Sequence, residues 1–575
     1  MTVGKAFRFW TRGLIGIAPL LTAAAGAYAQ ESPGKQEEKL TEVVITGSRI
    51  ARPELDRLEP TIVVGSESFD QRGYTDVGQA LSELPAFGIQ SSNATNTQSV
   101  FGIAQSFVDL YSLGSQRTLV LVDGRRFVSS NTASLFGGAT PPGQQVDLNV
   151  IPTKLIDRVE TISVGGAPIY GADAIAGTVN IIMKKNYEGL DLDGEVGVSD
   201  DKDAWNYRAR ILGGFNFAGD RGNVTAVAEF SKANGLTGPD RKNFSENLGF
   251  LAPAVPGTYQ SVLTPDLAVS QLSTGGVPYV DDFFYLPGLP PPFIGVTDAA
   301  GNPLAFSGGK LVPYSLGTAT GNPIFFSGGD GIRLSQFSNL LSPLERINID
   351  TIDSFKISDH VNLFAETWFS ETHARNLIAQ PAYNATIFGT AGTVNGDFKV
   401  PVNNPFLSPA DQATIENDLL AYQAAGFPMG QILTGAAAPL DPNWSPNFFY
   451  IARANTDLQG GEATGNQQMY RGVVGLKGDF SLGASHDYTW ELAVNYGHSQ
   501  NTSVQPAYVF QNLQNALNAT TVAGQIVCAP GYVNSPIATN SSTCAPLNIF
   551  GLGEPSAAAA DFRMCSAVRA SNSAA

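Results

Sequence analysis

The chain has 575 residues, with 51 acidic and 34 basic side chains and a formal net charge of −17. Such an acidic chain is poorly suited to neutralise phosphates, so a nucleic-acid partner is not expected. Charged residues make up 15% of the chain, below the roughly 25% of soluble globular domains. The length allows at least two domains.

The N-terminus has the pattern of a signal peptide. Lys5, Arg8 and Arg12 form a basic segment, and a mostly apolar segment, Leu14–Ala25, follows them. This apolar segment is shorter than the roughly 20 residues of a membrane-spanning helix. Small residues precede a cleavage site after Ala29, so residues 1–29 are expected to be removed. Three basic and no acidic residues are lost with them, and the formal net charge falls from −17 to −20.

A short β-branched segment follows the predicted cleavage site. Val43-Val44-Ile45-Thr46 is uncharged and lies between polar residues, with no core-like sequence directly after it. This pattern is typical of an extended strand without a sheet of its own, which can pair with the sheet edge of a partner. The same pattern also begins many ordinary strands, so its meaning depends on the neighbouring sequence.

Residues 51–187 are predicted to form a mixed α/β domain. The expected elements are strands at 60–64, 117–124 and 159–164, a helix at 77–84 and a short helix at 151–156. Pro85 ends the first helix, and an Asp-Gly turn ends the second strand. None of these elements carries residues at catalytic spacing.

Two segments of this domain resemble the plug domain of TonB-dependent outer-membrane receptors. They are Val146–Glu160, which reads VDLNVIPTKLIDRVE, and Ile169–Ile182, which reads IYGADAIAGTVNII. With Arg117–Arg126 and the β-branched segment, the resemblance extends over about residues 40–186. The competing interpretation is a soluble α/β domain punctuated by glycines.

The resemblance implies a fold, a location and a set of site residues. The implied fold is an α+β plug domain followed by an antiparallel transmembrane β-barrel in the cell outer membrane. The family has a short segment, the TonB box, that binds the C-terminal domain of TonB by β-strand addition. In this chain the box would comprise Glu42, Val43, Val44, Ile45, Thr46 and Gly47. The plug motif would comprise Arg117, Asp123, Gly124, Arg125, Arg126, Arg158, Glu160, Tyr170, Gly171, Asp173, Gly177 and Asn180. Gly171 and Gly177 of this motif would allow a tight turn.

Two positions depart from the family pattern. The family usually has two plug cations that meet acids on the barrel wall, and the corresponding residues here are Tyr111 and Ser163. Removing one partner of a buried ion pair costs about 3–5 kcal/mol. The plug is therefore expected either to face a wall without these acids or to be held by other cations. Arg125 and Arg126 are the candidates, unless they are solvated turn residues.

From residue 188 onward the sequence alternates between apolar and small or polar residues. Strands are expected at 190–198, 205–217 and 224–230, on both sides of 358–360, and at 470–480 and 488–496. Alternation with a period of two and few charged residues is typical of a transmembrane β-barrel. The alternative interpretation is a soluble, β-rich secreted protein. Short turns should face the periplasm and long connections the exterior.

The long connections are 235–343, 376–466 and 500–560. The first contains a duplication, Gly301–Gly309 and Gly321–Gly329, which predicts two similar hairpin arms. Alternatively, nearby aromatic side chains stack on a solute. These candidates are Phe283, Phe284, Tyr285, Phe325 and Phe326.

The three cysteines suggest an oxidising compartment. Cys528 and Cys544 lie in one predicted exterior loop, and a disulfide that closes about 17 residues would stabilise the fold by roughly 3 kcal/mol. Cys565 is left over. A zinc site is the alternative, but the chain has no Cys-x-x-Cys pair and its four histidines are distant in sequence from the cysteines.

Motifs for enzyme chemistry are lacking. The sequence has no Gly-x-Ser-x-Gly, phosphate-loop or His-Glu-x-x-His motif. Asp191–Gly194 is only a partial match to a calcium loop and fits strand alternation better. We therefore expect no catalytic activity, no cofactor and no metal.

Only seven or eight strands are recognisable, whereas receptors of this family have about 22. The last residues, 564–575, lack an alternating closing strand with a terminal aromatic, so the sequence predicts a fragment or a prematurely ended reading frame. Domain boundaries are expected at 1–29, 30–50, 51–187 and 188–575. The predicted function is energy-coupled import of a scarce solute: an iron chelate, cobalamin or an oligosaccharide. The alternative is a secreted or surface binding protein without transport.

Overall fold

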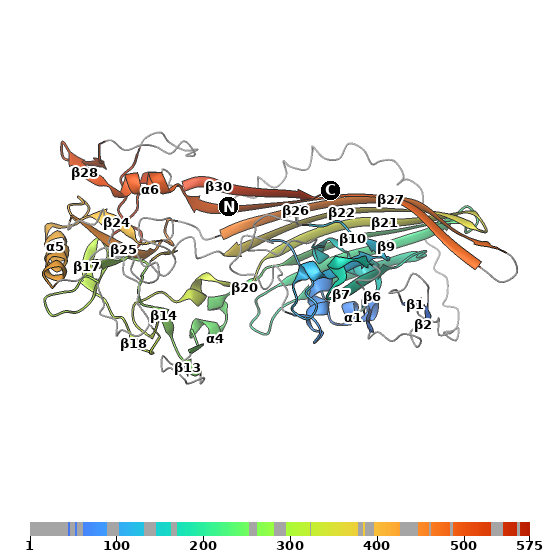
Figure 1. Ribbon diagram of the computed structural model, residues 1–575, viewed down its shortest axis with the longest axis horizontal. Helices are drawn as coiled ribbons and strands as arrows, with labels where there is room; N and C mark the ends of the chain where they lie inside the picture. The colour runs from blue at the N-terminus through green and yellow to red at the C-terminus, as the bar shows by residue number, and fades with distance from the viewer. Residues whose placement is uncertain are drawn as a thin grey trace.

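The computed structural model describes residues 44–45, 52–53, 61–88, 103–130, 145–162, 170–251, 261–280, 295–322, 324–377, 383–385, 396–425, 447–458, 462–482, 487–530, 544–559 and 564–574. The described residues form three parts (Figure 1): an N-terminal α/β domain, a large antiparallel sheet, and a loop assembly beyond one end of that sheet.

The N-terminal domain contains a five-stranded sheet in the order β3-β6-β7-β4-β5. Its elements are β3 (Thr61–Gly65), α1 (Ser66–Gln71), α2 (Val77–Ser82), η2 (Ser115–Arg117), β4 (Thr118–Val122), β5 (Arg125–Arg126), η3 (Leu148–Val150), η4 (Thr153–Leu155), β6 (Ile156–Ile162), η5 (Ala172–Ala174) and β7 (Gly177–Met183). Only the β4–β7 pair is parallel. Every residue of β4 is buried, because this strand lies inside the sheet and is apolar after its first residue, Thr118.

These elements agree closely with the predicted ones. Helix α2 begins after Asp76, whose carboxylate accepts a hydrogen bond from the Gln79 backbone N–H at 2.9 Å. The short helix expected at 151–156 is the 3₁₀ turn η4. Upstream, a two-residue ladder joins β1 (Val44–Ile45) to β2 (Arg52–Pro53).

The large sheet has eight antiparallel strands in the order β30-β27-β26-β22-β21-β10-β9-β8. They are β8 (Gly189–Gly197), β9 (Asn206–Phe217), β10 (Gly222–Ala233), β21 (Leu344–Ser358), β22 (Val361–Leu377), β26 (Glu462–Ser481), β27 (Asp487–Tyr508) and β30 (Met564–Ala574). Alternate residues of the strands from β8 to β27 face the N-terminal domain, and we call this side of the sheet the inward face. The opposite face is called outward. The turn end of the sheet carries the short connections, such as 218–221, and the loop end carries the long ones.

The strands are longer than the alternation of hydropathy predicted. Three strands extend into the segments expected to be loops. Strand β22 continues to Leu377, β26 begins already at Glu462, and β27 continues to Tyr508. Met564–Ala574 forms β30 along the edge of β27, although this segment has neither the alternation nor the terminal aromatic of a closing strand. Backbone pairing is independent of side-chain type, so a segment of small and polar residues can still complete a ladder.

The N-terminal domain and the inward face of the sheet share one hydrophobic core. Five inward residues of the sheet belong to the same buried cluster as Phe69, Leu81 and Val179 of the domain. They are Leu212, Val227, Ile352, Trp368 and Met469. The domain is therefore packed against the sheet rather than tethered beside it.

The loop assembly is formed by the described parts of residues 234–343, 383–458 and 509–559. Its elements are β11 (Leu236–Thr237), η6 (Gly238–Asp240), α4 (Lys242–Ser245), β12 (Gly249–Leu251), β13 (Val262–Thr264), β14 (Leu267–Val269), β15 (Val277–Tyr279), β16 (Leu304–Ser307), β17 (Lys310–Pro313), β18 (Thr318–Ala319), β19 (Phe325–Ser327), η7 (Leu334–Phe337), β20 (Asn339–Leu341), β23 (Tyr383–Asn384), β24 (Phe398–Pro401), α5 (Pro409–Ala424), β25 (Phe448–Ala454), α6 (Phe510–Leu517), β28 (Ala519–Val522) and β29 (Gln525–Cys528). All three loops contribute to one buried core, which includes Phe306, Phe449 and Phe550. The loops are thus a folded unit with a core of its own.

The two copies of the duplicated sequence have different structures. The first copy forms β16, which pairs with the following strand β17, as a hairpin arm would. The second copy forms β19, which pairs with the preceding β18 and with β14. The prediction of two similar arms was therefore wrong for the second copy, because its pairing depends on a distant strand.

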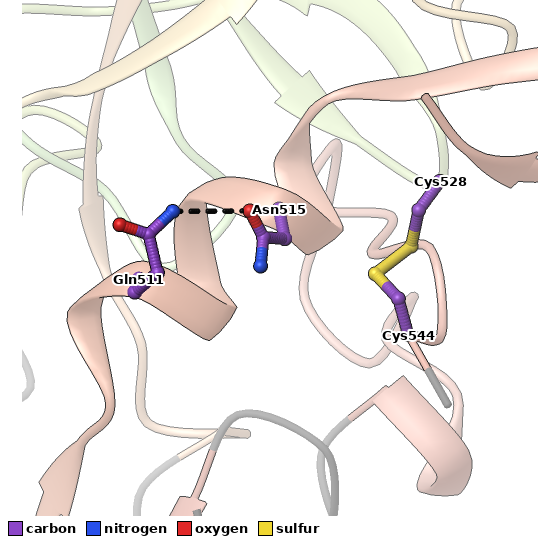
Figure 2. The surroundings of a disulfide bond; sticks show 4 residues. All are labelled: Gln511, Asn515, Cys528 and Cys544. Carbon is purple, nitrogen blue, oxygen red and sulfur yellow. Dashed lines mark hydrogen bonds between the residues drawn. A yellow bond between two sulfur atoms is a disulfide. The ribbon is translucent and has the colours of Figure 1, made fainter. Parts of the chain in front are cut away.

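Cys528 and Cys544 form a disulfide in this assembly, with 6.2 Å between their Cα atoms. Figure 2 shows this bond beside α6, where the Gln511 side chain donates to the Asn515 side chain at 3.1 Å. The disulfide joins the end of β29 to residues that enter the loop core, since Cys544 packs against that core. Within the part of the chain that the structure describes, no helix is both long and apolar enough to cross a membrane.

Candidate functional site

The candidate site is the contact between the N-terminal domain and the inward face of the large sheet. Arg125, on β5, reaches two acids of the sheet: its Nη1 lies 2.8 Å from Glu366 Oε1 and its Nε 2.9 Å from Glu491 Oε1. The Asp123-Gly124 turn directs β5 toward the sheet, and the Asn180 side chain accepts from the Gly124 N–H at 2.9 Å. Arg125 also lies over the Phe364 ring, 4.5 Å from its centroid.

Glu366 is shared by two arginines. Its second oxygen lies 2.9 Å from Nη1 of Arg471, which belongs to the neighbouring strand β26. The Glu366 side chain is 3% exposed, and an isolated carboxylate would not remain ionised at such a buried position. Arg471 in turn lies between aromatic rings of the two parts, 4.8 Å from the centroid of Phe127 and 5.8 Å from that of Trp368.

Arginines of the sheet hold a second segment of the N-terminal domain. Arg208 Nη1 donates to the Tyr74 carbonyl at 2.6 Å, and Arg210 Nη2 lies 2.7 Å from Asp70 Oδ1. Arg346 donates to the Thr75 carbonyl. Cations on the sheet therefore bind carbonyls and a carboxylate of residues 70–75. The family pattern predicted the opposite arrangement, in which cations of the plug meet acids of the wall.

Glu229 extends this contact to a third segment. It forms an ion pair with Arg346 at 2.8 Å and accepts from the Thr153 hydroxyl at 3.1 Å and from the Lys154 N–H at 3.2 Å. Lys154 Nζ lies 2.8 Å from Asp191 of β8. Acids and bases thus alternate across the interface, and each of these buried charges has a partner of opposite sign.

Two glycines of the sheet allow the N-terminal domain to approach closely. A Cβ atom at Gly465 would lie 2.4 Å from a methyl group of Ile103, and one at Gly497 would lie 2.2 Å from a methyl group of Val128. Any larger side chain at either position would have to displace the domain or its side chain. The interface is therefore complementary in shape as well as in charge.

The structure separates the two arginines proposed as substitutes for the missing cations. Arg125 contacts the sheet, whereas Arg126 pairs with Asp173 at 2.5 Å and donates to the Tyr170 carbonyl at 2.7 Å, inside its own domain. Tyr111 is 48% exposed with a φ of +57°, and its backbone N–H donates to the Ala86 carbonyl at 2.7 Å within the N-terminal domain. Ser163 lies outside the described residues.

The other residues of the predicted motif stabilise the N-terminal domain itself. Arg158 pairs with Asp157 and Glu160, and Arg117 donates to the Leu113 carbonyl. Gly171 has a φ of +90°, and a Cβ at Gly177 would lie 2.5 Å from the Ile162 carbonyl oxygen.

Among the groups of this domain with shifted pKa values are Asp123, Arg125 and Asp147. Burial raises the pKa of Asp123, against the opposing effect of Lys185, whose Nζ is 3.0 Å away. Burial alone would lower the pKa of Arg125, but the hydrogen bond to Glu491 and the charge of Glu366 outweigh it and raise that pKa. Burial raises the pKa of Asp147 to about 7, although two backbone N–H groups donate to its Oδ1.

Sequence reasoning missed most of the interface on the sheet side. Arg208, Arg210, Glu229, Arg346, Glu366 and Arg471 were not among the predicted site residues. A usable signal existed, because these charges lie at inward positions of strands whose outward positions are apolar.

The remaining predicted sites are only partly described. Val44 and Ile45 of the box form β1, which pairs with β2 rather than standing alone. Glu42, Val43, Thr46 and Gly47 lie outside the described residues, as do Phe283, Phe284 and Tyr285. Phe325 packs against the core of the loop assembly, so it is not a free stacking face, and Phe326 is half-buried in β19.

Comparisons with known proteins fit this architecture. Residues 54–178 match the family model of the TonB-dependent receptor plug domain. The N-terminal domain is therefore a TonB-dependent receptor plug, and an eight-stranded antiparallel sheet follows it. The predicted recognition and fold class are confirmed to this extent.

Solved structures of lower similarity include siderophore receptors. A variant of the ferric enterobactin receptor PfeA from Pseudomonas aeruginosa, in complex with enterobactin, is 14% identical with a TM-score of 0.33, over 78% of this chain and 50% of that one. The siderophore receptor PirA from Acinetobacter baumannii is 13% identical with a TM-score of 0.29, over 77% and 48% of the two chains. This chain spans about half the length of these receptors.

Proposed function

We propose that this chain acts in TonB-dependent import across the outer membrane, as the plug and part of the surrounding wall of a receptor. The solute would be scarce: an iron chelate, cobalamin or an oligosaccharide. The observation that carries the proposal is a plug domain bound by ion pairs to the inward face of an antiparallel sheet. A plug held in this way closes the path along the sheet until it is moved.

The contact between the plug and the sheet combines buried ion pairs with ion pairs that water can reach, as a movable plug needs. Glu366 is buried, but Glu491 is 44% exposed and Asp70 43% exposed, so water screens part of the interface. Much of the binding is therefore polar and directional. A pull on the plug can exchange such contacts for water, whereas a purely apolar interface would expose a large hydrophobic surface.

The outward face supports a position in a membrane. Leu492 and Val494, at successive outward positions of β27, and Leu190, on the edge strand β8, are each about two-thirds exposed. A soluble protein rarely leaves so large an apolar surface uncovered. Aromatic outward residues include Trp205, Tyr207, Phe215, Phe217, Phe230, Phe369, Tyr470, Tyr488 and Tyr496, as in the aromatic girdles of outer-membrane proteins.

The box is proposed to bind the C-terminal domain of TonB in the periplasm. Val44 and Ile45 already have strand conformation in β1, but their ladder with β2 ends at Pro53, which has no N–H to donate. A ladder of two residues is weak. A partner strand that pairs over the whole segment would therefore displace β2.

This proposal is tested by binding of the full chain to the purified TonB C-terminal domain. Val44→Pro and Ile45→Pro each remove a backbone donor and should abolish binding, whereas Val44→Thr keeps the donor and the β-branched shape and should bind normally. Undiminished binding by both proline variants would refute the assignment of residues 42–47. Equal loss in the threonine variant would show side-chain recognition rather than strand addition.

A further inference from the structure

A cavity opens on the outward face of the large sheet, at its loop end. Its volume is about 420 Å³, and its lining side chains come from five neighbouring strands, β10, β21, β22, β26 and β27. Because it lies on the face opposite the plug, the cavity is separate from the proposed import path. It is also separate from the ion pairs that hold the plug.

Basic side chains are concentrated around this cavity. Lys232, His373 and Arg375 line it together with a single acid, Glu345. Strand alternation places all four side chains outward, nearer the loop end of their strands than outward apolar residues such as Phe230, Ile349 and Phe369. The cavity therefore lies where the apolar band of the outward face gives way to charge.

The cations have only weak partners within the protein. Lys232 lies 3.3 Å from Glu345, and Arg375 lies 3.4 Å from Glu462. In both pairs the side chains are about half exposed, and surface pairs of this kind contribute little to stability. Both cations can therefore turn toward an anionic ligand at little cost.

Hydrogen-bonding groups complete the lining. Thr464 and Thr502 bring hydroxyl groups, and Asn466 brings an amide. Asn466 Oδ1 is buried and accepts no hydrogen bond from the described residues. An acceptor in this position fits a ligand that carries hydroxyl donors beside its negative charges.

We propose that this cavity binds the headgroup of a phosphorylated glycolipid of the outer leaflet. The cations would bind its phosphates, Asn466 and the threonines its sugar hydroxyls, and the apolar band below would contact its acyl chains. The position at the boundary between apolar and charged surface selects a membrane lipid over a free anion. The inference rests on the proposed membrane position of the sheet and does not depend on transport.

The test uses the full chain reconstituted into phosphatidylcholine vesicles that contain bis-phosphorylated lipid A. The variant combines Lys232→Gln, His373→Gln and Arg375→Gln, which are all exposed positions. Arg221→Gln is the matched control, because Arg221 is a cation at the turn end of the sheet that lies over the outward ring of Phe355. Lipid A retained by each protein after extraction is measured by native mass spectrometry, with a phosphate-free lipid A analogue and inorganic phosphate as comparison ligands.

The wild-type chain and Arg221→Gln should retain lipid A, and the triple variant should bind it at least about tenfold more weakly. Equal retention by the triple variant, or equal retention of the phosphate-free analogue, would overturn the site. Displacement of lipid A by millimolar inorganic phosphate would show a free-anion site instead and would also overturn it. Failure of the wild-type chain to float with any vesicles would overturn the membrane position, and normal flotation without the difference between variants would overturn the lipid site alone.

Discussion

Arg125 of the plug and Glu366 of the sheet lie 241 positions apart in the sequence, and 2.8 Å separates Nη1 of the arginine from Oε1 of the glutamate. Arg471 binds the other oxygen of the same carboxylate. The plug cation thus enters an ion pair that the sheet already contains. Glu366 therefore has a second cationic partner besides the one from the plug.

Removal of either partner should therefore have unequal effects. Glu366→Ala leaves the buried Arg471 guanidinium without its acid and should lower the free energy of unfolding by about 3–5 kcal/mol. Arg125→Ala should lower it less, because Arg471 still compensates Glu366. Urea unfolding of the chain in detergent measures both values. Arg126→Ala is the control for Arg125, because Arg126 binds Asp173 and the Tyr170 carbonyl within the plug. It should raise hydrogen exchange near residues 170–174, whereas Arg125→Ala should raise it in the plug segments that contact the sheet.

Restoring an arginine at Tyr111 should have almost no effect. The residue is exposed, so Tyr111→Arg should change the free energy of unfolding by no more than about 0.5 kcal/mol. Thermal unfolding of the plugged chain is a sufficient measurement. A large stabilisation would show that Tyr111 does reach an acid of the wall.

Stability should depend on pH through Asp147. Its pKa is raised to about 7 in the folded chain by burial, above the roughly 3.9 of an unfolded aspartate. Arg346 opposes this shift and Asp76 adds to it. The folded state therefore binds the proton more tightly than the unfolded state. The contribution of protonated Asp147 to stability is fully present below about pH 4 and is lost as the pH rises through about 7.

Asp147→Asn is the variant that tests this dependence. An amide keeps an acceptor for the backbone N–H groups of Ser106 and Asn149 but cannot ionise. Unfolding measured between pH 4 and pH 8 should show a fall for the wild type of the order of a few kcal/mol and a smaller fall for the variant. Parallel curves for the two proteins would mean that Asp147 does not titrate in this range.

Close packing of the plug should be sensitive to Gly497. A Cβ there meets Val128, whose β-branched side chain has few alternative rotamers, so Gly497→Ala should destabilise the docked plug by about 1–3 kcal/mol. Gly472→Ala is matched to it, because Gly472 lies in the adjacent strand β26 and a Cβ there meets no atom within 4 Å. Protection of the plug from limited proteolysis should fall only in Gly497→Ala.

Reduction of the disulfide should loosen the loop assembly and leave the plug unchanged. Cys528 and Cys544 are 16 positions apart, and opening a loop of this size costs about 3 kcal/mol. Dithiothreitol, or the pair Cys528→Ser and Cys544→Ser, should increase proteolysis within residues 509–559. Cys565→Ser without reductant should give the wild-type pattern, and faster proteolysis in that variant would implicate Cys565 in the pairing.

Local patterns were sufficient to predict the strands and most of the plug. The period of two marks inward and outward positions whatever lies across the sheet, and the Asp-Gly turn after β4 requires only neighbouring residues. The same patterns failed for β30, whose small and polar residues carry no alternation, and for the second copy of the duplicated sequence, whose strand pairs with β14 about 60 positions earlier.

The sequence by itself determined that a plug-like α/β domain precedes a series of alternating strands, because turn residues, glycine positions and hydropathy period act within a few residues. Only the tertiary structure decided that Arg125 rather than Arg126 reaches the sheet, that arginines of the sheet hold residues 70–75, and that three loops share one core. These contacts depend on the register and orientation of segments hundreds of residues apart. A local pattern gives the face on which a charge lies, but the charge that it meets is set by how the two surfaces pack.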